Sequence, residues 1–300
     1  MAAAGKTIRP RRSVLYVPGS NTRAIEKAKG LDVDSIIFDL EDAVAPEAKL
    51  DAREQVYQAV KAGDFGHREL VIRINALTSE FGRSDLDAAI TAKPDAIALP
   101  KVNGPADLKL VSGILKAQGA DPAIKLWAMM ETPLAMLNAK GIGLSGLEDD
   151  VRLDALVMGT NDLAKETGVA IAPGRAELMP WLMTCVAAAR AGRISIIDGV
   201  FNDFSKPEAF AEECAQGARM GMDGKTLIHP SQIEACHRAF SPGPYELAWA
   251  RKMIAAFDDP ANKSKGVVQV EGQMVERLHA DMGRHLVAVA EAIEARNMAG

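Results

Sequence analysis

Short runs of apolar and β-branched residues alternate along this chain with longer stretches whose apolar positions recur at helical spacing. Eight short runs are present, and each interval between them has room for one helix and two loops. The runs are Ser13–Val17, Ser35–Asp39, Leu70–Ile74, Ala96–Leu99, Leu126–Met130, Ala155–Met158, Ile194–Ile197 and Thr226–Ile228. This α/β alternation predicts eight parallel strands with helical crossovers, which matches a (β/α)8 TIM barrel.

Crossover helices are predicted at Leu50–Ala62, at Pro105–Gln118 and at Arg175–Arg190. Pro105 suits the first position of its helix, and Gly192 is expected to stop the third helix. A doubly wound open sheet is the rival fold. It is disfavoured because no Gly-x-Gly-x-x-Gly fingerprint follows the first run.

The two ends of the chain fall outside the barrel prediction. Residues 1–12 are polar and basic and lack the apolar region of a secretory signal, so we expect a short flexible tail and a cytoplasmic protein. The barrel should occupy residues 13–240. Residues 241–300 should form a C-terminal appendage with a helix to about Phe257, a strand at Val267–Val270 and a helix at Glu276–Arg296, which could cover the site or reach a neighbouring subunit.

Composition excludes several classes of function. The chain has 300 residues with a formal net charge of -5, so nothing favours binding to nucleic acid or to an anionic membrane. No apolar window approaches the roughly 20 residues that cross a bilayer. Cys185, Cys214 and Cys236 are odd in number and widely spaced, which predicts reduced thiols in helices.

Polar side chains gather where the predicted strands end, which in a TIM barrel is the face that carries the active site. The set comprises Tyr16, Pro18, Gly19, Asp39, Glu41, Asp42, Arg73, Asn75, Pro100, Lys101, Glu131, Gly159, Asn161, Asp162, Asp198 and His229. Asp39 has two possible roles, a functional one and a structural one in which it pairs with Arg73 or caps a helix.

The charges of this set suggest its chemistry. Glu131 and Asp162 end neighbouring strands and offer the hard oxygen ligands that Mg²⁺ prefers. Magnesium chelated by a 2-oxo or 2-hydroxy acid would act as a Lewis acid. Arg73 could neutralise an enolate or bind a carboxylate, and the backbone amides of Gly159, Thr160 and Asn161 could form an anion pocket. Together these features suggest that a carbon–carbon bond next to a carbonyl is made or broken.

Seven motifs at these strand ends occur in an order that is similar to a known family. They are Arg12-Ser-Val-Leu-Tyr-Val-Pro-Gly-Ser20, Phe38-Asp-Leu-Glu-Asp-Ala-Val44, Val71-Ile-Arg-Ile-Asn75, Leu99-Pro-Lys101, Met130-Glu-Thr-Pro133, Gly159-Thr-Asn-Asp-Leu163 and Gly224-Lys-Thr-Leu-Ile-His-Pro-Ser-Gln232. In this respect the chain resembles the citrate lyase beta subunit and malyl-CoA lyase family of the HpcH/HpaI aldolase superfamily.

The resemblance implies a magnesium-dependent CoA ester lyase that cleaves or forms a 3-hydroxyacyl-CoA, such as malyl-CoA, citramalyl-CoA or citryl-CoA, from a 2-oxo acid and an acyl-CoA. Glu131 and Asp162 would bind the metal, and Arg73 would hold the thioester oxygen. The CoA side would be lined by Tyr16, Pro18 and Gly19, and Lys101 would contact substrate or an acidic neighbour.

Two positions separate this chain from other members of the superfamily. Related 2-oxo acid aldolases end the second-strand motif in Glu-His, so Glu41-Asp42 favours the CoA lyase branch, with Asp39, Glu41 and Asp42 supporting the site. In the lyases, a C-terminal Gly-x-Met-Ile-Asp motif carries the catalytic acid into an adjacent subunit of a trimer or hexamer. Gly272-Gln-Met-Val-Glu276 stands here instead. Glu276 could be the proton donor, with a side chain that reaches about 1 Å farther than the family's aspartate. Alternatively, it is an acid that the helix dipole favours in the first turn of the last helix.

Two other activities remain open. A thioesterase on the same substrates would release free thiol without a 2-oxo acid. A citrate lyase-type subunit acting on an acyl carrier protein thioester would be inactive alone and would co-purify with its carrier.

Overall fold

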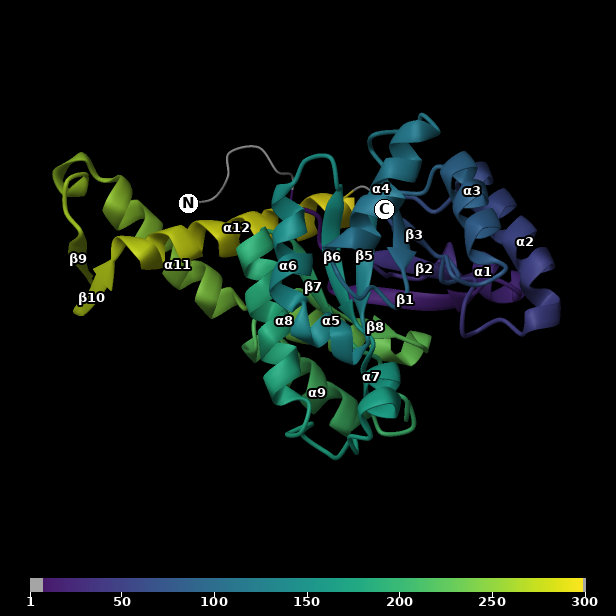
Figure 1. The fold of residues 1–300 in the computed structure, drawn as a ribbon. Coiled ribbons are helices and arrows are strands. Elements are labelled where there is room, and N and C mark those ends of the chain that lie inside the picture. Colours follow the sequence, from purple (N-terminus) through teal and green to yellow (C-terminus); the bar gives the residue numbers. More distant parts are fainter. Residues whose placement is uncertain (1–7, 299–300) are drawn as a thin grey trace. The chain divides into compact units, whose positions relative to one another are not determined.

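The computed structural model describes residues 8–298, which divide into two compact units. One unit comprises residues 11–240, and the other comprises residues 8–10 and 241–298 (Figure 1). Each unit has its own apolar core, so each is described by itself.

The larger unit is a closed barrel of eight parallel strands in which each strand pairs with its neighbour in sequence and β8 returns to β1 (Figure 1). The strands are β1 Ser13–Pro18, β2 Ser35–Asp39, β3 Glu69–Arg73, β4 Ala96–Leu99, β5 Lys125–Met130, β6 Leu153–Met158, β7 Ser195–Asp198 and β8 Gly224–Leu227. The predicted TIM barrel is confirmed, and every predicted strand end lies within two residues of the observed one.

Helices surround the barrel as expected from the crossovers. They are α1 Thr22–Ala28, α2 Lys49–Ala62, α3 Gly82–Ala92, α4 Pro105–Ala117, α5 Pro133–Leu137, α6 Ala139–Leu144, α7 Thr160–Thr167, α8 Met179–Gly192, α9 Pro207–Arg219 and α10 Ile233–Phe240, with short 3-10 turns at Pro46–Ala48, Ser145–Leu147 and Pro230–Gln232. The predicted stop at Gly192 was wrong by one residue. Gly192 lies inside α8, where its Cα packs against the backbone of Gly143 and leaves no room for a side chain, and Arg193 ends the helix with a left-handed φ of 56°.

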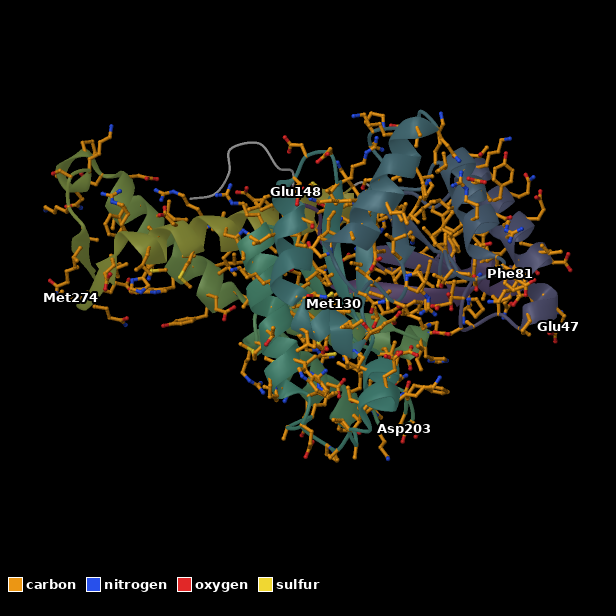
Figure 2. All side chains as sticks on the ribbon, in the orientation of Figure 1. Glu47, Phe81, Met130, Glu148, Asp203 and Met274 are labelled. Carbon is orange, nitrogen blue, oxygen red and sulfur yellow. The ribbon has the colours of Figure 1, made fainter. Side chains whose placement is uncertain are left out.

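Strand side chains alternate between two layers of core. Ten buried strand residues, among them Val14, Ile37, Trp127 and Met129, fill the inside of the barrel, while apolar strand residues of the opposite face, such as Ile36, pack outward against the helices. This is the layered filling typical of the fold. Figure 2 shows how densely side chains fill the barrel unit around the labelled Met130.

The N-terminal mouth of the barrel is closed by buried arginines. The Arg11 guanidinium donates to Glu69 at 2.7 and 2.8 Å and lies 4.9 Å from the centre of the Trp127 ring. Arg12 pairs with Asp34 at 2.8 Å. The expectation of a tail over residues 1–12 is therefore corrected at its last two residues, because their charges are matched by buried carboxylates. Residues 1–7 lie outside the described part of the chain.

The second unit consists of a helical pair and a hairpin. Its elements are α11 Pro244–Asp258, a 3-10 turn at Pro260–Asn262, β9 Val267–Val270, β10 Gln273–Glu276 and α12 Arg277–Met298. Glu271 and Gly272 have φ of 47° and 83° and form the two-residue turn between antiparallel β9 and β10. The predicted helix start at Glu276 was wrong by one residue, since Glu276 ends β10 and α12 begins at Arg277.

All three cysteines are buried free thiols in helices, as predicted. No helix among residues 8–298 is long and apolar enough to span a membrane.

Candidate active site

Glu131 follows directly after β5, and its carboxyl group is almost completely buried. The next two residues begin α5 as the sequence predicts: Thr132 caps the helix by accepting a hydrogen bond from Ala135 N at 3.0 Å, and Pro133 occupies the first turn. The backbone N–H of Lys101, at the end of β4, donates to Glu131 Oε1 at 2.7 Å. Two neighbouring strand ends therefore hold this carboxyl group in place.

The absence of a side chain at Gly159 leaves space for the Glu131 carboxyl group. A Cβ on Gly159 would lie 2.5 Å from Glu131 Oε2, so a side chain at this position would collide with it. Asp162 stands in the first turn of α7, which begins directly after Gly159. Burial, together with the negative charges of Glu41 and Asp162, raises the pKa of Glu131 to about 8, even though the Lys101 amide and Arg73 act to lower it. The positive charge around Glu131 is therefore too small to stabilise its anionic form.

Arg73, the last residue of β3, is held by three acids of the second strand end. Its Nε and Nη2 donate to the two Asp39 oxygens at 2.7 and 2.6 Å. Its Nη1 lies 3.1 Å from Glu41 Oε2 and 3.3 Å from Asp42 Oδ2. The expected pairing of Asp39 with Arg73 is confirmed. The hydrogen bonds to Asp39 and Asp42 use three of the five guanidinium N–H donors, and Glu41 lies beside the same Nη1, so at least one donor is left for another ligand.

Asp39 also shapes the loop that follows β2. Its carboxylate oxygens accept backbone hydrogen bonds from Glu41 and Ala43, each at 2.9 Å. The buried Lys49 ammonium donates to the carbonyl oxygens of Leu40 and Glu41 at 2.9 and 2.8 Å. Sequence reasoning missed Lys49 because it looked like an ordinary polar residue at the start of a helix.

Lys101 connects the two groups of acids. Its ammonium group pairs with Glu41 Oε1 at 2.7 Å while its amide binds Glu131. The predicted acidic neighbour of Lys101 is thus Glu41, and burial raises the pKa of that carboxyl group above its ordinary value.

The charges of this site do not balance. Five carboxylates face three cations here, and full ionisation would leave an excess of two negative charges; the acids are Asp39, Glu41, Asp42, Glu131 and Asp162, and the cations are Lys49, Arg73 and Lys101. A divalent cation bound to Glu131 and Asp162 would offset that excess. No group of three or more His, Cys, Asp or Glu side chains arranged to hold a metal is found within residues 8–298. Magnesium commonly keeps several water or substrate ligands beside one or two carboxylates.

The residues expected near CoA lie at the first strand end. The Tyr16 ring faces the barrel interior and packs under the Arg73 guanidinium at 5.0 Å, and burial raises the pKa of its phenol. Pro18 ends β1. Gly19 donates to Asp39 O at 2.8 Å, and a Cβ there would lie only 2.9 Å from that oxygen. Contact of these residues with CoA stays a prediction.

The predicted anion pocket lies at the start of α7. Thr160 is buried, whereas Asn161 is exposed and forms a reciprocal amide pair with Asn202 at 3.1 and 2.9 Å. The pairing of Asn161 with Asn202, from the loop after β7, could not be foreseen from sequence spacing.

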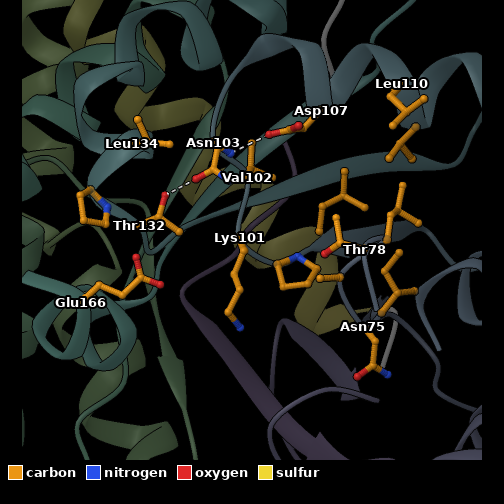
Figure 3. A pocket seen from close by; sticks show the side chains of 17 residues that line it. Asn75, Thr78, Lys101, Val102, Asn103, Asp107, Leu110, Thr132, Leu134 and Glu166 are labelled. Carbon is orange, nitrogen blue, oxygen red and sulfur yellow. Dashed lines mark hydrogen bonds between the residues drawn. The ribbon is translucent and has the colours of Figure 1, made fainter. Parts of the chain in front are cut away.

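A cavity of about 560 Å³ lies beside these acids, among the loops that follow β3, β4 and β5 (Figure 3). Lys101 and Thr132 line it together with apolar side chains such as Leu110, and Thr132 donates to Asn103 at 2.7 Å at its edge. Glu131 and Asp162 are not among its lining residues. The cavity therefore adjoins the carboxylate site without enclosing it.

Three other residues singled out in the sequence make contacts within their own units. The Asp198 side chain points away from the barrel interior and pairs with Arg175 and Lys225. His229 stacks on Phe204 with ring centres 4.7 Å apart. Glu276 is exposed in the second unit, and its N–H donates to His279 Nδ1 at 3.0 Å.

A parallel (β/α)8 barrel with acids and an arginine at its strand ends has the layout of a TIM-barrel enzyme. The family model described as HpcH/HpaI aldolase/citrate lyase matches residues 12–230, and the chain belongs to this enzyme family. The resemblance drawn from the seven motifs is thereby confirmed.

Three known proteins illustrate the relationship. The chain is 48% identical over 286 residues to (3S)-malyl-CoA thioesterase of Cereibacter sphaeroides, covering 95% of this chain and 96% of that one. It is 33% identical over 288 residues to citrate lyase subunit beta of Escherichia coli, covering 94% of both. The crystal structure of CitE from Mycobacterium tuberculosis, in complex with magnesium, acetoacetate and coenzyme A, is 25% identical and has a TM-score of 0.74 over 95% of this chain and 100% of CitE.

Proposed function

We propose that this protein is a magnesium-dependent enzyme that acts on the CoA thioester of a 3-hydroxy acid such as malyl-CoA. The observation that carries the proposal is the buried Glu131 carboxyl group, which faces an excess of negative charge beside Asp162 and Arg73. The CitE crystals contain magnesium and coenzyme A, and the relative named (3S)-malyl-CoA thioesterase is 48% identical. Both findings support this metal and this class of substrate.

Magnesium held by Glu131 and Asp162 would polarise the oxygens of a 2-oxo or 2-hydroxy acid. The protein's own residues supply the other parts. Arg73 would direct a remaining N–H donor to the thioester oxygen, and the bidentate bond to Asp39 fixes the plane of its guanidinium. Negative charge that develops on that oxygen would be stabilised by an Arg73 N–H donor that is already in position. Such preorganised donors usually make the largest single contribution to transition-state stabilisation.

We assign carbon–carbon cleavage as the first reaction. In malyl-CoA, the bond between the hydroxyl-bearing carbon and the carbon next to the thioester would break. The hydroxyl proton would pass to water, glyoxylate would form, and the acetyl-CoA enolate held by Arg73 would take up a proton. Glu276 is the candidate donor of that proton, delivered from an adjacent subunit of a homo-oligomer, a trimer or hexamer.

Hydrolysis of the thioester is the second candidate, favoured by the relative named (3S)-malyl-CoA thioesterase. In that reaction water attacks the thioester carbonyl carbon and the CoA thiolate leaves, giving malate and free CoA. The same Arg73 donor would then stabilise the oxyanion. Action on an acyl carrier protein thioester is the third possibility, and the relative named citrate lyase subunit beta supports keeping it.

One assay separates these outcomes. Purified protein is incubated with (3S)-malyl-CoA and Mg²⁺, and glyoxylate and free thiol are measured in parallel. Glyoxylate without thiol indicates the lyase, whereas thiol without glyoxylate indicates the thioesterase. No product from malyl-CoA, citramalyl-CoA or citryl-CoA would overturn the proposed function. Co-purification with an acyl carrier protein, together with no activity alone, would favour the carrier-bound subunit.

A further inference from the structure

Three buried charged side chains and the partly buried Glu213 lie between the barrel and α9 and form a group that we call the Arg175 ion cluster, comprising Arg175, Asp198, Glu213 and Lys225. Arg175 Nη1 donates to both Asp198 oxygens at 2.8 and 3.0 Å. Lys225 Nζ donates to Asp198 Oδ2 at 3.0 Å and to Glu213 Oε1 at 2.7 Å. Two cations balance two acids, so the cluster is neutral, in contrast to the active site.

The Arg175 ion cluster holds the backbone of Gly199 through hydrogen bonds to both its carbonyl oxygen and its amide. Lys225 Nζ donates to Gly199 O at 2.6 Å, and Gly199 N donates to Asp198 Oδ1 at 2.8 Å. Lys225 and Asp198 are both completely buried. Because breaking such bonds would leave uncompensated buried charge, Gly199 has little freedom to move.

Gly199 in turn packs against the start of α7. A Cβ on Gly199 would lie 2.6 Å from Thr160 Oγ1 and 3.0 Å from Met158 O. Thr160 is the first residue of α7 and stands two positions before Asp162. The fixed Gly199 backbone therefore packs directly against the first residue of the helix that carries Asp162.

A second contact joins the same two segments. Asn202, in the loop after β7, forms the reciprocal amide pair with Asn161, the residue directly before Asp162. The helix α7 has only 8 residues, too few to be stable by itself. Its first turn therefore depends on these outside contacts for its position.

We propose that the segment from Gly199 to Asn202, anchored by the Arg175 ion cluster, positions Asp162 for metal binding. Asp198 and Lys225 act through Gly199 and Thr160, and Asn202 acts through Asn161. This inference rests on the proposed function, since it requires Asp162 to be a metal ligand. It gives Asp198 a positioning role, although its side chain lies outside the catalytic site.

The test uses Asn202→Ala, because Asn202 is exposed and its loss should leave the fold intact. Mn²⁺ serves as the probe, with its dissociation constant measured by electron paramagnetic resonance. We expect Asn202→Ala to weaken Mn²⁺ binding about three- to tenfold, since one lost amide pair is worth roughly 1 kcal/mol and outer contacts of a ligand tune metal affinity. Asn262→Ala in the second unit, which removes a part-buried side-chain hydrogen bond to the Ala256 carbonyl oxygen, is the control and should bind Mn²⁺ like the wild type.

Two further readouts separate positioning from general destabilisation. Without metal, hydrogen exchange at the first turn of α7 should be faster in Asn202→Ala, while the denaturation midpoint stays unchanged. In a double-mutant cycle, Asn161→Ala combined with Asn202→Ala should bind Mn²⁺ no more weakly than the weaker single variant. Asp198→Asn should also weaken Mn²⁺ binding, and Asn202→Ala still decides the matter if that variant does not fold.

The outcomes distinguish this inference from the proposed function. Wild-type affinity and unchanged exchange in Asn202→Ala would overturn the positioning role while leaving the metal site intact. A wild-type protein that binds neither Mn²⁺ nor Mg²⁺ would overturn the metal assignment, and the positioning role would fall with it.

Discussion

The backbone amide of Lys101 donates to the buried Glu131 carboxyl group at 2.7 Å, while the ammonium group of the same residue pairs with Glu41 at 2.7 Å. Lys101 adopts a left-handed φ of 52°, which turns its N–H toward Glu131. One residue at the end of β4 thus orients the candidate metal ligand and offsets part of its negative surroundings.

Lys101→Met should separate these two roles. The variant keeps the backbone amide and removes the positive charge, so Mg²⁺ should bind about two- to fivefold more tightly, because a nearby like charge has been lost. Isothermal titration calorimetry measures this change. Lys109→Met, which breaks a surface pair with Glu148, should leave the affinity unaltered. Weaker Mg²⁺ binding in Lys101→Met would show that the ammonium group does not repel the metal.

Arg73→Met should damage both stability and activity. Asp39 would remain buried without its partner, which costs about 3–5 kcal/mol of unfolding free energy. Loss of the donor for the thioester oxygen should reduce kcat/KM by about 10²–10³. Chemical denaturation and steady-state kinetics measure the two effects.

Arg12→Met provides the matched control for Arg73→Met. It breaks the buried Arg12–Asp34 pair at the opposite end of the barrel, so it should lower the stability to a similar extent while the folded protein keeps its kcat. If both variants lost kcat equally, the effect at Arg73 would be structural and not catalytic.

Glu131 makes the effect of Mg²⁺ depend on pH. Its folded-state pKa of about 8 lies above the ordinary 4.5, so the fold favours the protonated form. The stability that this preference contributes is complete below about pH 4.5 and is lost as the pH rises toward 8. Magnesium requires the carboxylate, so Mg²⁺ binding should release close to one proton near pH 7 and should raise Tm more at pH 8 than at pH 6.

Calorimetry in buffers of different ionisation enthalpy counts the released protons, and thermal melts at the two pH values give the Tm changes. Glu131→Gln has no proton to lose at this position, so it should show neither the proton release nor the larger effect at pH 8. Proton release that persists in this variant would assign the linkage to another group.

The sequence predicted the barrel well because parallel strands buried on both faces read as continuous apolar runs. It also located Glu131 and Asp162, since acids that follow such runs must lie at the strand ends. It could not tell which way the last side chain of a strand points, because alternate residues face opposite sides. Asp198 was for this reason grouped with the site although it faces α9. The β10 strand could not be predicted, because Glu271-Gly272 forms its two-residue turn with positive φ at both residues but is not one of the dipeptides that typically mark such a hairpin.

Gly159→Ala should weaken metal binding strongly without unfolding the protein. The new Cβ would lie 2.5 Å from Glu131 Oε2, so the carboxyl group would have to move. We expect at least a tenfold loss of Mg²⁺ affinity, measured by calorimetry. Gly113→Ala in α4 meets open space and should stabilise the protein by up to about 1 kcal/mol with unchanged affinity. Normal Mg²⁺ binding in Gly159→Ala would argue that Glu131 is not a ligand.

Substitution of Glu276 tests whether this residue donates the proton that the enolate takes up. It ends β10 with its side chain exposed, and Met274, two residues earlier on the same face of the strand, is 77% exposed (Figure 2). If Glu276 is the general acid, Glu276→Gln should lower kcat by about 10²–10⁴ while Mg²⁺ affinity stays at the wild-type value. Glu271→Gln, at the turn of the same hairpin, is the matched control and should retain full kcat.

An experiment with mixed subunits tests whether each active site contains residues from two chains. Glu276→Ala protein and Glu131→Ala protein should each be inactive. After they are unfolded together and refolded, activity should partly return, because some sites would combine an intact Glu131 from one chain with an intact Glu276 from another. Refolding each variant alone gives the baseline. Mixed oligomers with no recovered activity would place both residues of a working site in the same chain, or would remove Glu276 from the chemistry if Glu276→Gln is also fully active.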